Sequence, residues 1–135
     1  MKPRNKQNLR SPTARALGLG SAKEGVGHWW VQRVTAIALV PLTIWFVASI
    51  LAIAGSDHAT VIAWLGAPSS LVCMILLLIA LFYHLALGLQ VVIEDYIHSG
   101  AKIWALLATR FVCFALAVAG IIATLRIAFV AWAAT

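Results

Sequence analysis

The chain has 135 residues, of which 63% are hydrophobic and only 10% are charged, and its mean hydropathy is +0.98. A soluble domain is nearer half apolar and a quarter charged, so this composition excludes an ordinary soluble protein and indicates an integral membrane protein. The formal net charge is +6, but no basic face or reader domain accompanies it, which argues against nucleic-acid binding.

Residues 1–27 are polar, basic and rich in Gly, Pro and Ser, and we expect a flexible tail there. Ser21 and Glu24 have the spacing of a capping box, which permits a short helical turn. Six Lys and Arg residues precede Trp29, and such an excess marks the cytoplasmic side of a membrane. No cleavable apolar core follows the basic residues, so we expect no secretory signal.

Residues 28–135 are expected to form one membrane anchor, with transmembrane helices at about 29–54, 70–93 and 103–131. Trp29 and Trp30 suit the headgroup region at the start of the first helix. Pro41 is expected to kink that helix, because it removes a backbone hydrogen bond and clashes with the preceding turn. The segment 61–66 is expected to lie at the opposite interface.

The predicted fold is therefore an all-α membrane protein with three transmembrane helices. A cytoplasmic N-terminus places the loop at 95–101 in the cytoplasm and the C-terminus in the periplasm. Cys73 and Cys113 fall within apolar runs and are expected to be reduced. Arg110 and Arg126 lie one to two turns inside the ends of the third helix, where their side chains can reach toward headgroups.

His84 is an ionisable residue in the middle of the second apolar run, and such a residue is a functional candidate by default. It is either a neutral histidine that hydrogen-bonds a neighbouring helix or an axial ligand of haem iron. Gly88, one turn later, leaves room for a macrocycle, although glycine also serves plain helix packing. The predicted depths of the other histidines (His28, His58 and His98) exclude them as the second axial ligand. A haem at His84 therefore requires a ligand from another chain.

Asp95 and Tyr96 end the second apolar run, and Asp95 lies on the same helical face as His84, three turns and about 20° further along. The pair is either an interfacial anchor or part of a quinone pocket. In a quinone pocket the tyrosyl hydroxyl donates to a quinone carbonyl and the carboxylate orients the site and relays protons. His28 and Arg33 either anchor the first helix at the interface or contact haem propionates.

Two blocks carry a resemblance to a known family: GLGSAKEGVGHWWVQRVTAIALVPL, at 18–42, and HLALGLQVVIEDYIH, at 84–98. They resemble the smaller hydrophobic membrane-anchor subunit of succinate dehydrogenase, in its alphaproteobacterial form. The second block holds a His, a Gly four residues later and an Asp-Tyr pair eleven and twelve residues later. The similarity covers about residues 17–130.

The resemblance implies that His84 ligates the iron of haem b opposite a histidine of the sister cytochrome b anchor subunit. It implies that Tyr96 and Asp95 help bind ubiquinone, that His28 and Arg33 lie near the propionates, and that the complex lies in a bacterial inner membrane. A flavoprotein subunit with FAD and an iron–sulphur subunit with its clusters are the implied partners, together with membrane lipid. Succinate is then oxidised on the flavoprotein, and this chain holds no succinate-oxidising site.

Two alternative functions stay open at this stage. One is the anchor of a quinol:fumarate reductase, in which electrons flow in the opposite direction. The other is a cofactor-free structural or transport-accessory membrane bundle. A b-type haem spectrum that depends on His84 would separate the two haem-binding functions, the succinate dehydrogenase anchor and the fumarate reductase anchor, from the cofactor-free bundle.

Overall fold

The computed structural model describes residues 23–134, and within that range all regular structure is α-helical. The helices are α2 (Lys23–Ile53), α3 (His58–Gly66), α4 (Pro68–Tyr96) and α5 (Ala101–Ala133). The three long helices are each long and apolar enough to cross a membrane. The predicted fold class, an all-α membrane protein with three spans, is therefore confirmed.

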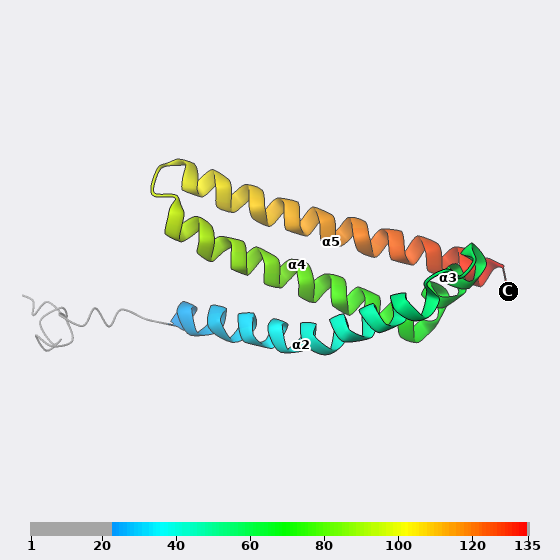
Figure 1. Cartoon of the computed structure of the whole chain (residues 1–135). Helices are drawn as coiled ribbons and strands as arrows, with labels where there is room; N and C mark the ends of the chain where they lie inside the picture. The colour runs from blue at the N-terminus through cyan, green and yellow to red at the C-terminus, as the bar shows by residue number, and fades with distance from the viewer. Residues whose placement is uncertain (1–22, 135) are drawn as a thin grey trace, which may run out of the picture.

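Helix α4 lies between the other two long helices, packed against α2 on one side and α5 on the other (Figure 1). Each long helix runs antiparallel to the next, so the start of α2, the end of α4 and the start of α5 lie together. We call this end of the bundle the Tyr96 end. The opposite end, which includes α3, is called the Asp57 end.

Helix α2 begins earlier than predicted. The tail was expected to extend through residue 27, but residues 23–27 already belong to α2, because no proline or turn sequence separates them from the apolar run. Ser21 of the proposed capping box lies outside the described residues. The helix bends along its length (Figure 1), and Pro41 lies inside it, which is the expected cause of such a bend.

The segment that was expected to lie at the interface forms a separate short helix, α3. Its N-cap is Asp57, whose carboxylate accepts hydrogen bonds from the backbone N–H of Thr60, at 3.2 Å, and from the Thr60 hydroxyl. The Thr60 hydroxyl and backbone N–H hold the pKa of the Asp57 carboxyl below its usual range. Gly55, with φ of +84°, lies in the sharp turn that directly follows α2.

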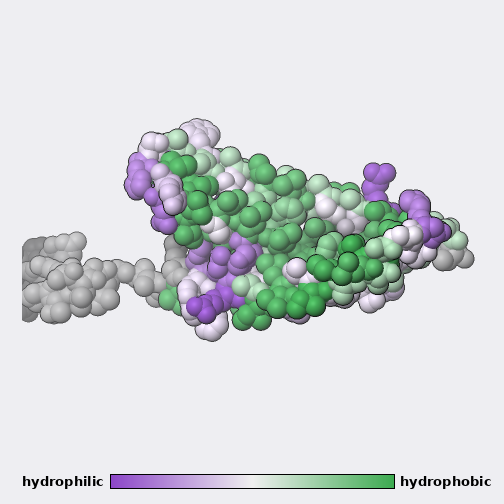
Figure 2. All heavy atoms as spheres, viewed as in Figure 1, coloured by the Kyte–Doolittle hydropathy of each residue, from purple (hydrophilic) through white to green (hydrophobic). Residues whose placement is uncertain are grey.

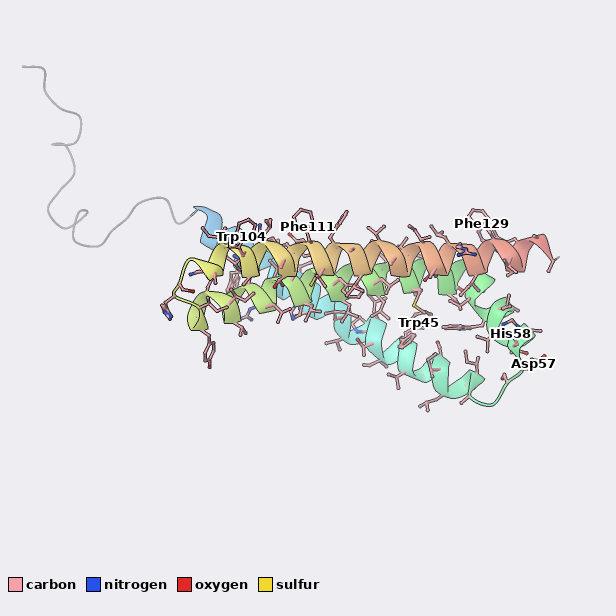
Figure 3. The ribbon with its side chains drawn as sticks, turned by 90° about the horizontal axis from the view of Figure 1, so that it is seen from above. Trp45, Asp57, His58, Trp104, Phe111 and Phe129 are labelled. Carbon is pink, nitrogen blue, oxygen red and sulfur yellow. The ribbon has the colours of Figure 1, made fainter. Side chains whose placement is uncertain are left out.

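Helix α3 is fixed against the end of α5 and against α2. The indole Nε1 of Trp132 donates to the carbonyl oxygen of Gly66 at 2.7 Å. Trp64 stacks on Trp45, with ring centroids 5.9 Å apart and an interplanar angle of 23°. Figure 3 shows Trp45 on α2, with Asp57 and His58 further along at the end of the bundle. These contacts close the Asp57 end of the bundle.

Replacing Gly66 is expected to destabilise this end, because a Cβ atom at Gly66 would collide with the Cβ of Ala131. Overpacking of this kind typically costs about 1–3 kcal/mol. We expect Gly66→Ala to lower the thermal midpoint of the detergent-solubilised protein, measured by circular dichroism. Gly100→Ala is the matched control, since nothing lies within 4 Å of the Cβ position there, and it should unfold like the wild type.

Helix α4 continues further than predicted. The loop was expected to begin at Asp95, but Asp95 and Tyr96 form the last turn of α4, and the Ile97 N–H still bonds the Ile93 carbonyl at 3.0 Å. No helix-breaking residue occurs before Gly100, so the helical hydrogen bonds persist to the acidic cluster. As a consequence, both predicted quinone-site side chains are held by a helix rather than by a loop.

Few apolar side chains of the chain are buried within it. The buried hydrophobic residues are Leu71, Leu77, Ala80, Cys113 and Ala128, and none of the apolar window of α2 is buried. Figure 2 shows a broad hydrophobic band between hydrophilic ends on the face in view. This pattern fits a bundle surrounded by lipid and by other apolar helices. Cys73 and Cys113 are free, as predicted.

Candidate functional site

A stripe of polar side chains on α2 faces the predicted site on α4. His28, Gln32 and Thr35 are spaced i, i+4 and i+7 along α2, so they share one helical face. All three are partly buried, whereas most of their neighbours on α2 are exposed. The stripe meets α4 at His84 and Gly88.

His84 is partly buried and hydrogen-bonds the stripe on α2. Its ring nitrogen Nδ1 lies 2.9 Å from the Thr35 hydroxyl oxygen, Oγ1. The same hydroxyl oxygen lies 2.8 Å from the Val31 carbonyl oxygen and 3.0 Å from that of Gln32. The other ring nitrogen, Nε2, makes no hydrogen bond with any residue in the range 23–134. A histidine with one nitrogen held by the protein and the other open is arranged like a metal-ligating histidine.

Gly88 lies one turn from His84, at a point where α2 approaches loosely. A Cβ atom at Gly88 would have the Gln32 amide nitrogen, Nε2, as its nearest neighbour outside its own turn, at 4.0 Å. That distance is ordinary van der Waals contact, so the helices do not need a glycine here for close packing. The position beside His84 therefore has room for a methyl group, and Gln32 of α2 lies directly across from it.

Two buried polar atoms on the same stripe have no hydrogen-bond partner. They are His28 Nε2 and Gln32 Oε1, and no residue that the structure describes pairs with either atom. Leaving a buried polar group unpaired typically costs about 1–3 kcal/mol. Such atoms need an explanation, and an absent ion, water or ligand is a common one.

His28 and Arg33 lie on different faces of α2, about 140° apart by helical geometry. His28 shares the face of Thr35, and the antiparallel packing places it at a depth between His84 and Asp95. Arg33 is exposed, and its guanidinium carbon lies 4.7 Å from the centroid of the Trp29 ring. The structure thus brings His28 to the His84 face and holds Arg33 on an aromatic ring away from it.

Asp95 and Tyr96 end α4 at the Tyr96 end of the bundle, and both are exposed. Tyr96 is the more notable of the two, because 82% of its surface is open. Neither side chain makes a hydrogen bond with another residue of the described range. A tyrosyl hydroxyl and a carboxylate that are held by a helix but have no hydrogen-bond partner among residues 23–134 can bind a partner or ligand.

A second polar network links α4 to α5 on another face. Arg110 donates from Nη2 to Gln90 Oε1 at 2.9 Å, and Gln90 Nε2 donates to Glu94 Oε1 at 2.9 Å. Gln90 and Arg110 line a groove of about 530 Å³ between α4 and α5, which is also lined by Tyr83. The groove faces away from His84, so it is separate from the candidate site.

Removing the Arg110 side chain should loosen the pairing of α4 with α5 near the Tyr96 end. Hydrogen bonds between transmembrane helices contribute about 0.6–1.7 kcal/mol, so we expect Arg110→Met to cost about 1 kcal/mol. Controlled sodium dodecyl sulphate unfolding would measure the loss. Arg126→Met is the control, because Arg126 is exposed and hydrogen-bonds no other described residue; an equal loss in both variants would contradict a specific role for the Gln90 bond.

Thr35 and Gln32 are site residues that the sequence analysis did not single out. Thr35 is only weakly polar and stands in an apolar run, and Gln32 lies beside Arg33 at the edge of the span, where polar residues are ordinary. The available signal was the i, i+4, i+7 spacing from His28. Within the described range, no group of three or more His, Cys, Asp or Glu side chains could hold a metal ion.

Comparison with known proteins identifies the family of this chain. Residues 7–124 match the family model described as succinate dehydrogenase/fumarate reductase transmembrane subunit. The chain belongs to this family. The match spans all of α2, α3 and α4 and most of α5, and it therefore covers both the polar stripe on α2 and the segment 84–96 of α4.

Individual relatives agree with this family. The chain is 42% identical over 90 residues to the succinate dehydrogenase hydrophobic membrane anchor subunit of Rickettsia bellii, covering 67% of this chain and 72% of that protein. It is 33% identical over 92 residues to the protein of the same name from Paracoccus denitrificans, covering 68% and 71%. The succinate dehydrogenase membrane anchor subunit of Reclinomonas americana is 29% identical over 90 residues, covering 64% and 75%. No solved structure matches the chain.

Proposed function

We propose that this protein is a membrane-anchor subunit of a succinate:quinone oxidoreductase in a bacterial inner membrane. The family and the names of its relatives support this function. The excess of Lys and Arg before Trp29 supports a cytoplasmic Tyr96 end. A flavoprotein and an iron–sulphur subunit then dock on that end, and the chain carries no succinate-oxidising site itself.

We further propose that His84 ligates haem b through Nε2 and that the second axial ligand is a histidine of a sister anchor subunit. One observation carries this proposal: His84 has its Nδ1 engaged by Thr35 while Nε2 has no partner among the described residues. The absence of a side chain at Gly88 and the unpaired atoms of His28 and Gln32 also support a ligand beside His84. His28 is placed to contact a propionate. Arg33 is a weaker candidate, since it lies on Trp29.

Such a haem would supply a one-electron carrier and, through coordination of its iron by both chains, a link between two anchor subunits. The chain's own residues would orient the ligating histidine. Thr35 holds the His84 ring in place from α2. Because both subunits would ligate the iron, neither anchor subunit would hold haem alone. Haem binding would then require that the two anchor subunits assemble.

Tyr96 and Asp95 form this chain's part of the proposed quinone site. The Tyr96 hydroxyl donates a hydrogen bond to a quinone carbonyl oxygen, and that bond strengthens as negative charge develops on reduction. The Asp95 carboxylate, which is exposed at the same helix end, accepts a proton from water and passes it to the reduced oxygen. Ubiquinone is the proposed acceptor, and the iron–sulphur and sister subunits complete the pocket.

Co-purification tests the subunit assignment. We expect an affinity-tagged copy of the chain, extracted in mild detergent, to elute with a flavin-containing subunit, an iron–sulphur subunit and a second small membrane protein. The eluate should reduce a soluble ubiquinone analogue with succinate. A chain that elutes without a flavoprotein would contradict the proposal and favour a cofactor-free bundle, and a complex that only reduces fumarate with quinol would favour a fumarate reductase anchor.

A further inference from the structure

The hydroxyl of Thr35 connects three groups at the α2–α4 interface. Its Oγ1 lies within 3.0 Å of the Val31 and Gln32 carbonyl oxygens and of His84 Nδ1. A hydroxyl has one proton to donate and can accept with its lone pairs, whereas a carbonyl oxygen can only accept. Counting the protons therefore decides which of the His84 nitrogens carries hydrogen.

Two proton arrangements are possible. If the Thr35 hydroxyl donates to a backbone carbonyl of α2, its oxygen accepts from Nδ1–H of His84 and two hydrogen bonds form. If it donates to Nδ1 instead, only one bond forms, and the hydrogen then on Nε2 has no acceptor among the described residues. The first arrangement also matches the usual behaviour of threonine in a helix, which donates to the carbonyl four residues earlier, here that of Val31.

We propose that Thr35 is the positioning residue for His84: its hydroxyl accepts the Nδ1 proton and so holds Nε2 bare and directed away from α2, ready to bind iron. This inference rests on the proposed haem function. It adds a residue on α2, 49 positions away in sequence, whose role no motif in α4 indicates. Thr35 acts only through His84 and does not itself touch the cofactor.

The hydrogen bond should affect both the affinity and the electronics of the site. It fixes the ring orientation, so binding iron costs less rotational freedom. It also makes the imidazole a stronger donor, which favours the ferric state over the ferrous state and lowers the reduction potential. Removing the hydrogen-bond partner of a metal-ligating histidine typically lowers metal affinity by about 10–100-fold. A neutral hydroxyl is a modest acceptor, so we expect an effect near the lower end, about tenfold.

The test compares four versions of the complex purified from membranes: wild type, Thr35→Val, Thr35→Ser and Thr43→Val. Valine keeps the shape of threonine but cannot accept the Nδ1 proton, whereas serine can. Thr43 is an exposed threonine on the same helix, so Thr43→Val controls for loss of a hydroxyl in α2. Haem loss to excess apomyoglobin and the midpoint potential of the b-type spectrum are the two measurements.

We expect Thr35→Val to lose haem about tenfold faster than wild type and to shift its potential upward, while Thr35→Ser and Thr43→Val behave like wild type. Thr35→Val with wild-type haem loss and potential would overturn the proposal, as would a Thr35→Ser complex altered as strongly as Thr35→Val. If Thr35→Val does not assemble, Thr35→Ala provides the same comparison.

The two proposals fail in different ways. If the wild-type complex contains no haem, or if haem persists unchanged in His84→Ala, then the haem function itself is wrong and the role of Thr35 falls with it. If the wild type binds haem through His84 but loss of the Thr35 hydroxyl changes neither measurement, only the positioning role is wrong. The His84→Ala complex therefore belongs in the same series.

Discussion

Replacing His84 with alanine is expected to remove the b-type absorption bands of the purified complex. The imidazole is the only iron ligand that this chain is proposed to give, and alanine leaves no donor atom in its place. Alanine is smaller than histidine, so the substitution adds no bulk that would exclude haem. We expect the haem-to-flavin ratio to fall by more than about tenfold, beyond what loss of the Thr35 hydrogen bond alone would cause.

The controls for this experiment come from the chain's other histidines. His58 is exposed at the start of α3, at the opposite end of the bundle from Tyr96 (Figure 3), so His58→Ala should keep the full spectrum. The pyridine haemochrome assay measures haem, and bound flavin measures complex. A His84→Ala complex with wild-type haem content would show that another residue ligates the iron, and the assignment of His84 would then be withdrawn.

Replacing Tyr96 with phenylalanine is expected to slow quinone reduction by about 100-fold, the effect typical of removing one hydrogen-bond donor to a developing oxyanion. The change removes one hydroxyl from a side chain that is 82% exposed and has no hydrogen bond to another described residue, so it should not disturb folding. Succinate oxidation with a soluble dye as acceptor should be unchanged, because that electron path ends before the quinone.

Tyr83 offers a matched control on the same helix. It is 50% exposed and lines the groove between α4 and α5 rather than the Tyr96 end. Tyr83→Phe should therefore keep both activities. Steady-state assays with succinate and a ubiquinone analogue, run beside the dye assay, separate the two paths. Equal quinone turnover in Tyr96→Phe and wild type would exclude Tyr96 from the reaction.

Hydropathy alone was sufficient to predict the three transmembrane helices, because each span carries an unbroken apolar run that no soluble fold would require. The ends of the helices were less predictable. Asp95 and Tyr96 are polar and were assigned to a loop, yet they extend α4 because a helix ends where its backbone bonds end and not where its hydropathy falls. Helix α3 was not predicted because its nine residues are too few to show a clear helical repeat of apolar side chains.

The candidate site was predicted on α4 but only partly on α2. His84 and Asp95 share a face of one helix, so their relation follows from sequence spacing. The contact between Thr35 and His84 depends on how two helices pack, and a single sequence does not specify that packing. Arg33 was grouped with His28 because both flank Trp29 and Trp30, but the five-residue spacing turns Arg33 to another face of α2, where it lies over Trp29.

The optical and electron-spin-resonance spectra of the oxidised wild-type complex test the central claim most directly, since that claim is a haem iron shared between His84 and a histidine of another chain. The account predicts a haem-to-flavin ratio near unity and a low-spin signal typical of two imidazole ligands. A complex without haem, or a high-spin iron with a single protein ligand, would contradict it.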